Sequence, residues 1–382
     1  MTTFDANPPL VDLRLHHSSH RQLLVKVPVS EATPARVDAV VVPAARPVQW
    51  LQESMELARE LGAALLVLCS KGLTAAEAAS LADELDVPAI AVDVGHNRGS
   101  LPAFATTRLL GQRDFMRPSD TSVKRNLALY MARLAGWERV LFLDDDITNV
   151  QPLDACAAAG LLDDFEVVGL NNIGFPDNSV VCHVHRELGN EQAQFVGGGG
   201  MAVAPMRNGS FFPDIFNEDW FYMLGTGEPL RVAVTGQMAQ KNHDPLDANR
   251  ARSEELGDCL AEGLFWLLDQ GLTTQSADEA HWREFLGRRG YFIGHLHTEV
   301  ANYELSPDLT KRLITSLDAA WRKWMQITSE LCTEFVWWWR IDLEIWRSFL
   351  QKQPVGLGLA EALEYVGWQG VVKSRIPWPT SL

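Results

Sequence analysis

Arg139-Val140-Leu141-Phe142-Leu143-Asp144-Asp145-Asp146-Ile147 is the stretch of this sequence that decides the fold. Apolar residues of strand-forming type lead directly into three carboxylates, which is the pattern of a buried strand with acids at its end. Clustered carboxylates repel one another unless a cation, a proton or a hydrogen-bond donor compensates them. Hard oxygen ligands suit Mg²⁺ or Mn²⁺, and these ions usually arrive with a substrate diphosphate. The stretch therefore predicts a metal–diphosphate site.

The residues before this stretch alternate strand and helix patterns. Strands that alternate with helices predict an α/β fold with a parallel sheet, whose ligands bind beyond the carboxyl ends of the strands. Because alternate residues of an extended strand share a face, Asp144 and Asp146 are expected to point one way and Asp145 the other. The expected strands are 37–42 (ended by Pro43), 64–69 and 89–94, and the expected helices are 50–61, 74–85 and a third that is capped by Thr121 or Ser122 and ends at Gly136.

The rest of the chain divides at about residue 250. Before that point the sequence predicts short strands and one short helix, and after it the sequence reads as helical and rich in Trp. We expect three parts: an N-terminal arm (1–35), an α/β domain (36–250) and a helical C-terminal region (251–382). The expected strands are 166–170, 179–184, 201–204 and 231–234, the short helix opens at 217–220, and the long helices are 252–270 and 307–349.

The bulk composition excludes several classes of protein. The 382 residues carry a net charge of −16, which argues against nucleic acid as a partner and requires local cations for any anionic substrate. The five cysteines are scattered, without a CxxC pair, so a disulfide framework is not expected. A reducing, cytoplasmic location is expected instead. Neither a signal peptide nor a membrane span is expected.

Two further groups of residues suggest chemistry. Glu218 and Asp219 open a helix, where acids are favoured by the dipole; either could also be a general base for an attacking hydroxyl. Gly197–Gly200 cannot stabilise a helix or strand, so the run is either a mobile loop or a place where a ligand approaches the backbone.

Histidines and basic residues complete the candidates. His243 is a candidate metal ligand, which would require a neutral imidazole, and a surface role is the alternative. Lys124 and Arg125 stand at a helix start, where a phosphate would gain from the dipole, and Arg46 follows the first strand. An exposed helix face explains these basic residues equally well. His295 and His297 form an alternative pair, whereas His183 and His185 alternate along an expected strand and are interpreted as structural.

The ordered set of motifs over residues 36–250 resembles the glycosyltransferases of the GT-A fold, especially those of family 2. That resemblance implies a Rossmann-like, mostly parallel central sheet, with a helical extension at the C-terminus. The matching segments are Val42-Pro43 (opening nucleotide-binding strand), Lys124-Arg125-Asn126 (Arg-Asn helix start), Asp144-Asp145-Asp146 (DXD motif), Gly198–Met201 (glycine-rich sugar and acceptor loop) and Glu218-Asp219 (ED motif).

The resemblance also implies roles and partners. Asp144 would contact the ribose and the metal region, Asp146 would ligate Mn²⁺ or Mg²⁺, and His243 would match a late metal-binding histidine. Asp219, with Glu218 beside it, would be the catalytic base of an inverting transfer. The donor would be a UDP- or GDP-linked sugar, and the acceptor is unknown. The expected donor contacts are Pro43, Arg46, Asp93, Lys124, Arg125, Asp144, Asp145, Gly198, Gly199 and Gly200.

One departure leaves alternatives open. Leu68-Cys69-Ser70-Lys71-Gly72 lacks the acid that reads the base in many relatives, although Asp93 after the third strand could substitute. The alternatives are a nucleotidyltransferase, a sugar mutase and a catalytically inactive binding or scaffold protein. A nucleotidyltransferase would require a glycine-rich basic loop after the first strand, and Ala44-Ala45-Arg46-Pro47 is not such a loop. The Trp residues after residue 251 are expected in a core, with a homo-oligomer face or an acceptor site as alternatives.

Overall fold

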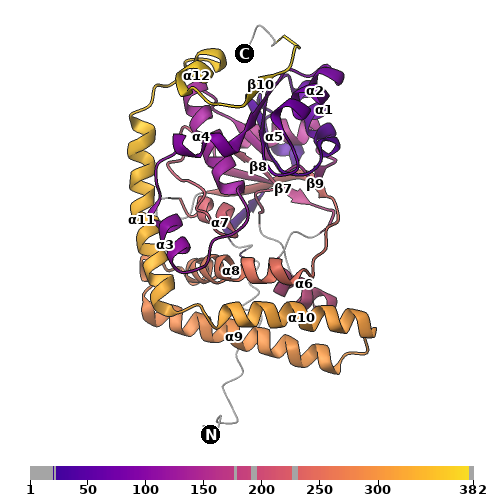
Figure 1. The fold of residues 1–382 in the computed structure, drawn as a ribbon, viewed down its shortest axis with the longest axis vertical. Coiled ribbons are helices and arrows are strands. Elements are labelled where there is room, and N and C mark those ends of the chain that lie inside the picture. The colour runs from indigo at the N-terminus through magenta and orange to yellow at the C-terminus, as the bar shows by residue number, and fades with distance from the viewer. Residues whose placement is uncertain (1–19, 21–22, 176–178, 191–195, 226–230, 378–382) are drawn as a thin grey trace. The chain divides into compact units, whose positions relative to one another are not determined.

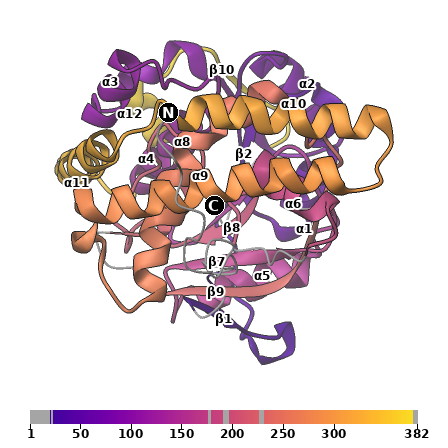
Figure 2. The same ribbon diagram turned by 90° about the horizontal axis from the view of Figure 1, so that it is seen from below.

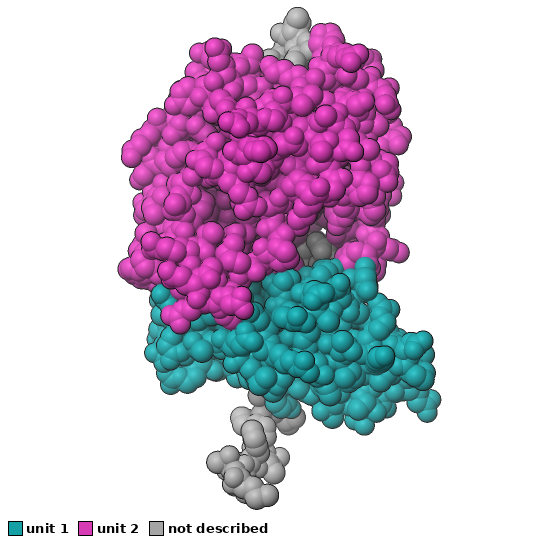
Figure 3. Space-filling model, in the orientation of Figure 1, with its two compact units in different colours: residues 1–21, 178–195, 244–336 teal, residues 22–177, 196–243, 337–382 magenta. Residues whose placement is uncertain are grey.

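The structure is a computed structural model that describes residues 20, 23–175, 179–190, 196–225 and 231–377. The chain forms two compact units, coloured separately in Figure 3. Unit 1 consists of Met1–Arg21, Asn178–Phe195 and Asp244–Val336, and unit 2 of Gln22–Asp177, Val196–His243 and Trp337–Leu382.

Unit 2 is built on a mixed, mostly parallel sheet, several strands of which are labelled in Figure 1. The strand order is β1-β9-β7-β8-β5-β2-β3-β4-β10. β8 runs antiparallel to both of its neighbours, β10 runs antiparallel to β4, and β6 pairs antiparallel with β9. The expected α/β class is therefore confirmed. The strands are β1 (Leu24–Lys26), β2 (Ala39–Ala44), β3 (Ala64–Cys69), β4 (Ala89–Asp93), β5 (Val140–Leu143), β6 (Ile147–Thr148), β7 (Val167–Asn172), β8 (Gly200–Val203), β9 (Val232–Gln240) and β10 (Val371–Lys373).

Helices cover this sheet and bury its alternate side chains. Val40 and Val42 of β2 and Leu141 of β5 share one core with apolar residues of α1, α2 and α5. α4 contacts β2, and Phe142, whose side chain alternates with Leu141, packs edge-on against Phe212. The helices of unit 2 are α1 (Gln52–Leu61), α2 (Ala75–Glu84), α3 (Ala105–Gln112), α4 (Thr121–Ala135), α5 (Pro152–Leu161), α7 (Glu218–Met223) and α12 (Leu359–Val366).

Unit 1 is helical and has its own core. α9 and α10 lie side by side (Figure 2), and α10 also packs on α8 and α6. Its helices are α6 (Val180–Glu187), α8 (Ala248–Asp269), α9 (Glu279–Asn302), α10 (Pro307–Trp324) and the first part of α11 (Ser329–Gln351), which continues into unit 2. Among the described residues, no helix is both long enough and apolar enough to cross a membrane.

Several expected elements are wrong. The expected strand at 179–184 is helix α6. The expected helix over 307–349 is two helices, α10 and α11, and the Thr328 hydroxyl accepts the N–H of Leu331 at 3.2 Å at the start of the second. Pro43 lies inside β2 and does not end it.

The division of the chain also differs from the expected parts. Residues 337–382 cluster with the sheet and 178–195 with the helices, so 251–382 is not one region. Within the expected N-terminal arm, β1 belongs to the sheet, where it pairs with β9.

Candidate functional site

The three acids after β5 lie in a turn. β5 ends at Leu143, and the N–H of Ile147 donates to the carbonyl of Asp144 at 3.0 Å. The chain then returns as β6, and the N–H of Lys241 donates to the carbonyl of Asp146 at 2.9 Å. Because the backbone is turned here, the strand alternation does not hold. The expectation that Asp144 and Asp146 point together is wrong, since they bind different cations.

Asp145 and Asp146 share Arg46, the second residue after β2. Asp145 accepts the backbone N–H groups of Ala45 at 2.8 Å and Arg46 at 2.9 Å, and it contacts the Arg46 side chain. Asp146 Oδ2 accepts from Arg46 Nη2 at 2.9 Å and from Gln240 Nε2 at 3.3 Å. Burial lowers the pKa of Arg46, but the two carboxylates outweigh it and raise that pKa. Arg46 thus serves as the counter-ion of two of the three acids.

Arg125 of α4 bridges the third acid to α7. Its Nη2 donates to Asp144 Oδ1 and its Nη1 to Glu218 Oε1, each at 2.9 Å. Burial lowers the pKa of Arg125, but Asp144 and Glu218 outweigh it and raise that pKa. Burial also raises the pKa of Asp144 to about 6, despite Arg125. A Cβ atom on Gly198 would lie 2.4 Å from Arg125 Nη1, so the bridge requires a glycine there.

The two acids of α7 have different surroundings. Glu218 is buried against Arg125, and Arg117 lies 3.6 Å from its second oxygen. Asp219 is partly exposed, and its oxygens accept the N–H groups of Gly198 at 2.5 Å and Trp220 at 2.9 Å. Burial raises the pKa of Asp219, against the effect of Arg125. Asp144 is near enough to contribute to that raised pKa.

Three of the expected donor contacts also have structural contacts within unit 2. Lys124 is buried, and its Nζ donates to Ala44 O and Ser70 Oγ at 2.7 Å, joining the ends of β2 and β3. Asp93 accepts the N–H of Ala75 at 2.8 Å, at the start of α2. Pro43 is buried within β2.

Two further glycines of the run, Gly199 and Gly200, are closely packed, and Gly199 lies beside the acid turn. The carbonyl of Gly199 accepts the N–H of Asp144 at 2.9 Å, which fixes the turn to the loop before β8. Gly200 begins β8, and a Cβ there would lie 2.3 Å from the sulfur of Met238. Gly198 and Gly199 therefore allow close packing at Arg125 and the acid turn, and Gly200 allows it at Met238.

The expected metal ligands Asp144, Asp146 and His243 do not form one group. His243 packs edge-on against Phe175, with ring centroids 4.7 Å apart. In the part of the chain that the structure describes, no three His, Cys, Asp or Glu side chains form a group that could hold a metal ion. Mg²⁺ and Mn²⁺ often use one or two protein carboxylates and complete their shell with water and substrate phosphate. Asp144 and Asp146 fit that smaller donor set, although Arg46 now holds Asp146.

Two site residues carried no signal in the sequence. The Trp50 ring lies 5.4 Å from Arg46 Cζ and 4.6 Å from Lys241 Nζ, measured to the ring centroid. Lys241 follows β9, and only the fold brings it to the loop after β2. Lys241 therefore joins the candidate site through long-range packing, whereas Trp50, in the short helix Val48–Leu51, is close to Arg46 in the sequence.

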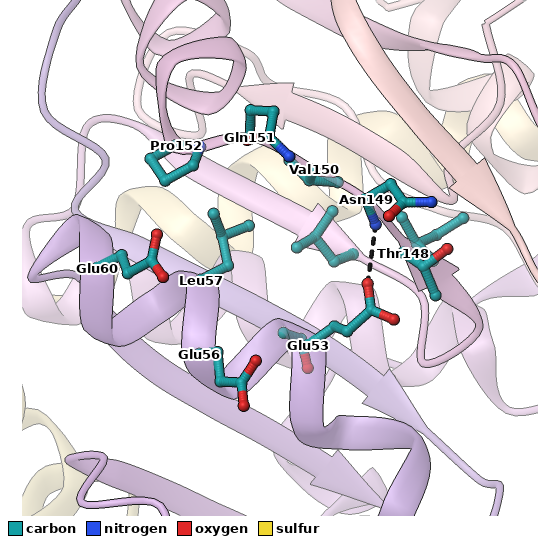
Figure 4. Close-up of a pocket in the computed structure, with 12 residues that line it drawn as sticks. Glu53, Glu56, Leu57, Glu60, Thr148, Asn149, Val150, Gln151 and Pro152 are labelled. Carbon is teal, nitrogen blue, oxygen red and sulfur yellow. Dashed lines mark hydrogen bonds between the residues drawn. The ribbon is translucent and has the colours of Figure 1, made fainter.

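A separate pocket of about 220 Å³ lies between α1 and residues 147–152 (Figure 4). Glu53, Glu56 and Glu60 of α1 line it, and Glu53 accepts the N–H of Asn149 at 2.8 Å. Three carboxylates along one wall would repel a diphosphate, so this pocket is not assigned to the phosphates of a donor.

Comparisons with known proteins assign no family. No family model and no curated protein matches the chain. Among solved structures, the chain is similar to the mannosyltransferase PcManGT from Pyrobaculum calidifontis in complex with GDP-Man and Mn²⁺, at 13% identity over 93% of this chain and 94% of that chain, with a TM-score of 0.38. A likeness at this level assigns neither a fold family nor an activity.

Proposed function

We propose that this protein is a GT-A glycosyltransferase that moves a sugar from a UDP- or GDP-linked donor to an acceptor hydroxyl with inversion. The observation that carries the proposal is the arrangement around Arg125, which ties Asp144 of the acid turn to Glu218. It leaves the adjacent Asp219 partly exposed. A donor site and a base are thereby held beside each other.

The chain's own groups supply the steps of this transfer. Asp219 takes the proton of the acceptor hydroxyl, and the acceptor oxygen forms a bond to the anomeric carbon. The bond from that carbon to the diphosphate oxygen breaks, and the electron pair leaves with the nucleoside diphosphate. The raised pKa of Asp219 makes it a better proton acceptor than an ordinary aspartate.

Asp144 and Asp146 would hold Mn²⁺ or Mg²⁺ in this proposal. The ion would supply Lewis-acid stabilisation of the charge on the departing diphosphate. The local charges support this requirement. Five carboxylates (Asp144, Asp145, Asp146, Glu218 and Asp219) lie beside three guanidinium groups (Arg46, Arg117 and Arg125) and the ammonium group of Lys241, so these residues have no excess of positive charge for an anionic donor.

The test is to incubate the protein with UDP- and GDP-sugars and Mn²⁺ and to measure release of nucleoside diphosphate. We expect release with at least one donor, and loss of that release when EDTA removes the metal and its recovery when Mn²⁺ is restored. Three results would overturn the proposal: release of pyrophosphate from sugar 1-phosphate and NTP, isomerisation of a sugar phosphate, or nucleotide binding without turnover of any donor.

A further inference from the structure

We propose that Arg46 occupies the place of the divalent cation in the substrate-free site and transfers to the donor diphosphate beside Trp50 and Lys241. Metal and nucleotide then bind together, and neither binds tightly alone. This inference rests on the proposed function and adds a binding order to it.

The contacts of Asp145 and Asp146 show what would change when Arg46 leaves. Asp145 would keep two backbone N–H donors, from Ala45 and Arg46. Asp146 would keep the side-chain amide of Gln240 at 3.3 Å and no guanidinium. A buried carboxylate that loses its cation needs another one. Arg46 and a divalent ion are therefore alternative partners of Asp146.

The exposure of Arg46 allows this exchange. The Arg46 side chain is 41% exposed, whereas the carboxylates that it binds are 2% and 4% exposed. The guanidinium can therefore reach a bound ligand without unfolding its surroundings. A phosphate accepts two parallel N–H bonds from arginine, so a diphosphate is a suitable new partner.

Trp50 and Lys241 mark where the diphosphate would sit. Arg46 and Lys241 both lie against the Trp50 ring, at 5.4 Å and 4.6 Å from its centroid. Two cations beside one ring repel each other, and an anion between them removes that repulsion. Lys241 is also fixed to the acid turn, because its N–H donates to the carbonyl of Asp146.

The test measures Mn²⁺ binding by electron paramagnetic resonance, without turnover, in the presence and absence of UDP and GDP. For the wild type we expect weak binding of Mn²⁺ alone, and a gain of about tenfold or more when the matching nucleotide is added. Arg46→Gln should bind Mn²⁺ alone about tenfold more tightly and lose most of the nucleotide-dependent gain. Lys241→Gln should keep the wild-type affinity for Mn²⁺ alone and bind the nucleotide about tenfold more weakly. These magnitudes correspond to the loss of one charged contact.

Arg59→Gln is the matched control, since it removes one positive charge from α1 in the same unit and leaves the acids untouched. It should behave as the wild type. If Arg46→Gln does not fold, Arg46→Lys keeps the charge but loses the paired N–H contacts, and its Mn²⁺ affinity should lie above that of the wild type. An unchanged Mn²⁺ affinity in the folded Arg46 variant would overturn this inference and leave the proposed function standing. A wild type that binds no nucleotide with Mn²⁺ would overturn both.

Discussion

Glu218 and Asp219 are adjacent acids whose surroundings give them different chemistry. Both oxygens of Glu218 face guanidinium groups, those of Arg125 at 2.9 Å and Arg117 at 3.6 Å. Burial raises the pKa of Glu218, as it raises that of Asp219, so the pKa does not separate the two acids. Protonation of the buried Glu218 would weaken both of its ion pairs. Asp219 is partly exposed and bound by two backbone N–H groups. The role of base is therefore proposed for Asp219.

Asp219→Asn should keep donor binding and lower the rate of sugar transfer by about 10²–10⁴-fold, because the amide has the same shape but cannot take up a proton. Initial rates and calorimetric titration with nucleotide and Mn²⁺ measure the two effects separately. An equal loss of donor affinity would show that Asp219 acts in binding. Glu218→Gln is the comparison, and it should lower stability as well, since it removes a charge from the Arg125 bridge.

Lys124 and Arg125 show what a sequence pattern does not predict about single residues, namely the direction in which each side chain points. Both were candidates for phosphate binding, because both stand at a helix start. Successive residues of a helix point about 100° apart, so the two side chains leave α4 in different directions. Lys124 reaches the ends of β2 and β3, and Arg125 reaches the acids. Neighbouring positions in the sequence do not reveal which of two cations faces a site.

At the scale of elements, the sequence predicted the central strands of the sheet, missed the short strands β1, β6 and β10, and predicted helix α6 wrongly as a strand. β2, β3 and β5 are buried apolar runs between turn residues, and local sequence determines them. Val180, Val181 and Val184 also fit a short strand, but all three are buried in the core of unit 1 as part of helix α6. A short apolar run fits either structure, and here tertiary packing decides.

The glycine run before β8 supports the bridge made by Arg125. Gly198→Ala would place a methyl group 2.4 Å from the Arg125 guanidinium, which is buried and held by two carboxylates. We expect a loss of about 1–3 kcal/mol of stability and a loss of transfer rate of about 100-fold. Urea unfolding and initial rates measure these losses.

Gly95→Ala is the control for that substitution, because a Cβ at Gly95 meets nothing within 4 Å. It should change the free energy of unfolding by less than about 0.5 kcal/mol. Equal effects of the two substitutions would mean that the packing of Gly198 on Arg125 is unimportant.

At the scale of the whole molecule, the sequence did not predict the division into two units. Residues 178–195 belong to unit 1, although unit 2 residues precede and follow them in the chain. Residues 337–382 belong to unit 2, although they follow the helices of unit 1. β10, near the C-terminus, pairs with β4 in the first hundred residues. Such contacts depend on which surfaces meet after the elements form, and no local pattern records them.

Unit 1 contains a row of buried acids along α8 that the sequence did not mark as special. Arg289 binds Glu255 at 2.8 Å and Asp258 at 2.9 Å, with all three side chains buried. Near the C-terminal end of α8, His20 contacts Asp269 at 2.5 Å and Glu262 at 3.2 Å. The stability of this unit should therefore depend on the charge of His20.

Burial lowers the pKa of His20, but Asp269 and Glu262 outweigh it and raise that pKa from 6.5 to about 9. A raised folded-state pKa gives stability that is fully present below pH 6.5 and is lost as the pH rises through about 9. We expect the free energy of unfolding to fall by about 3 kcal/mol across this range, from about 1.4 kcal/mol for each unit of pKa. His20→Gln cannot titrate, so the difference between the two proteins in urea unfolding should shrink steadily from pH 6.5 to 9. A difference that stays constant with pH would show that His20 is uncharged in the folded protein.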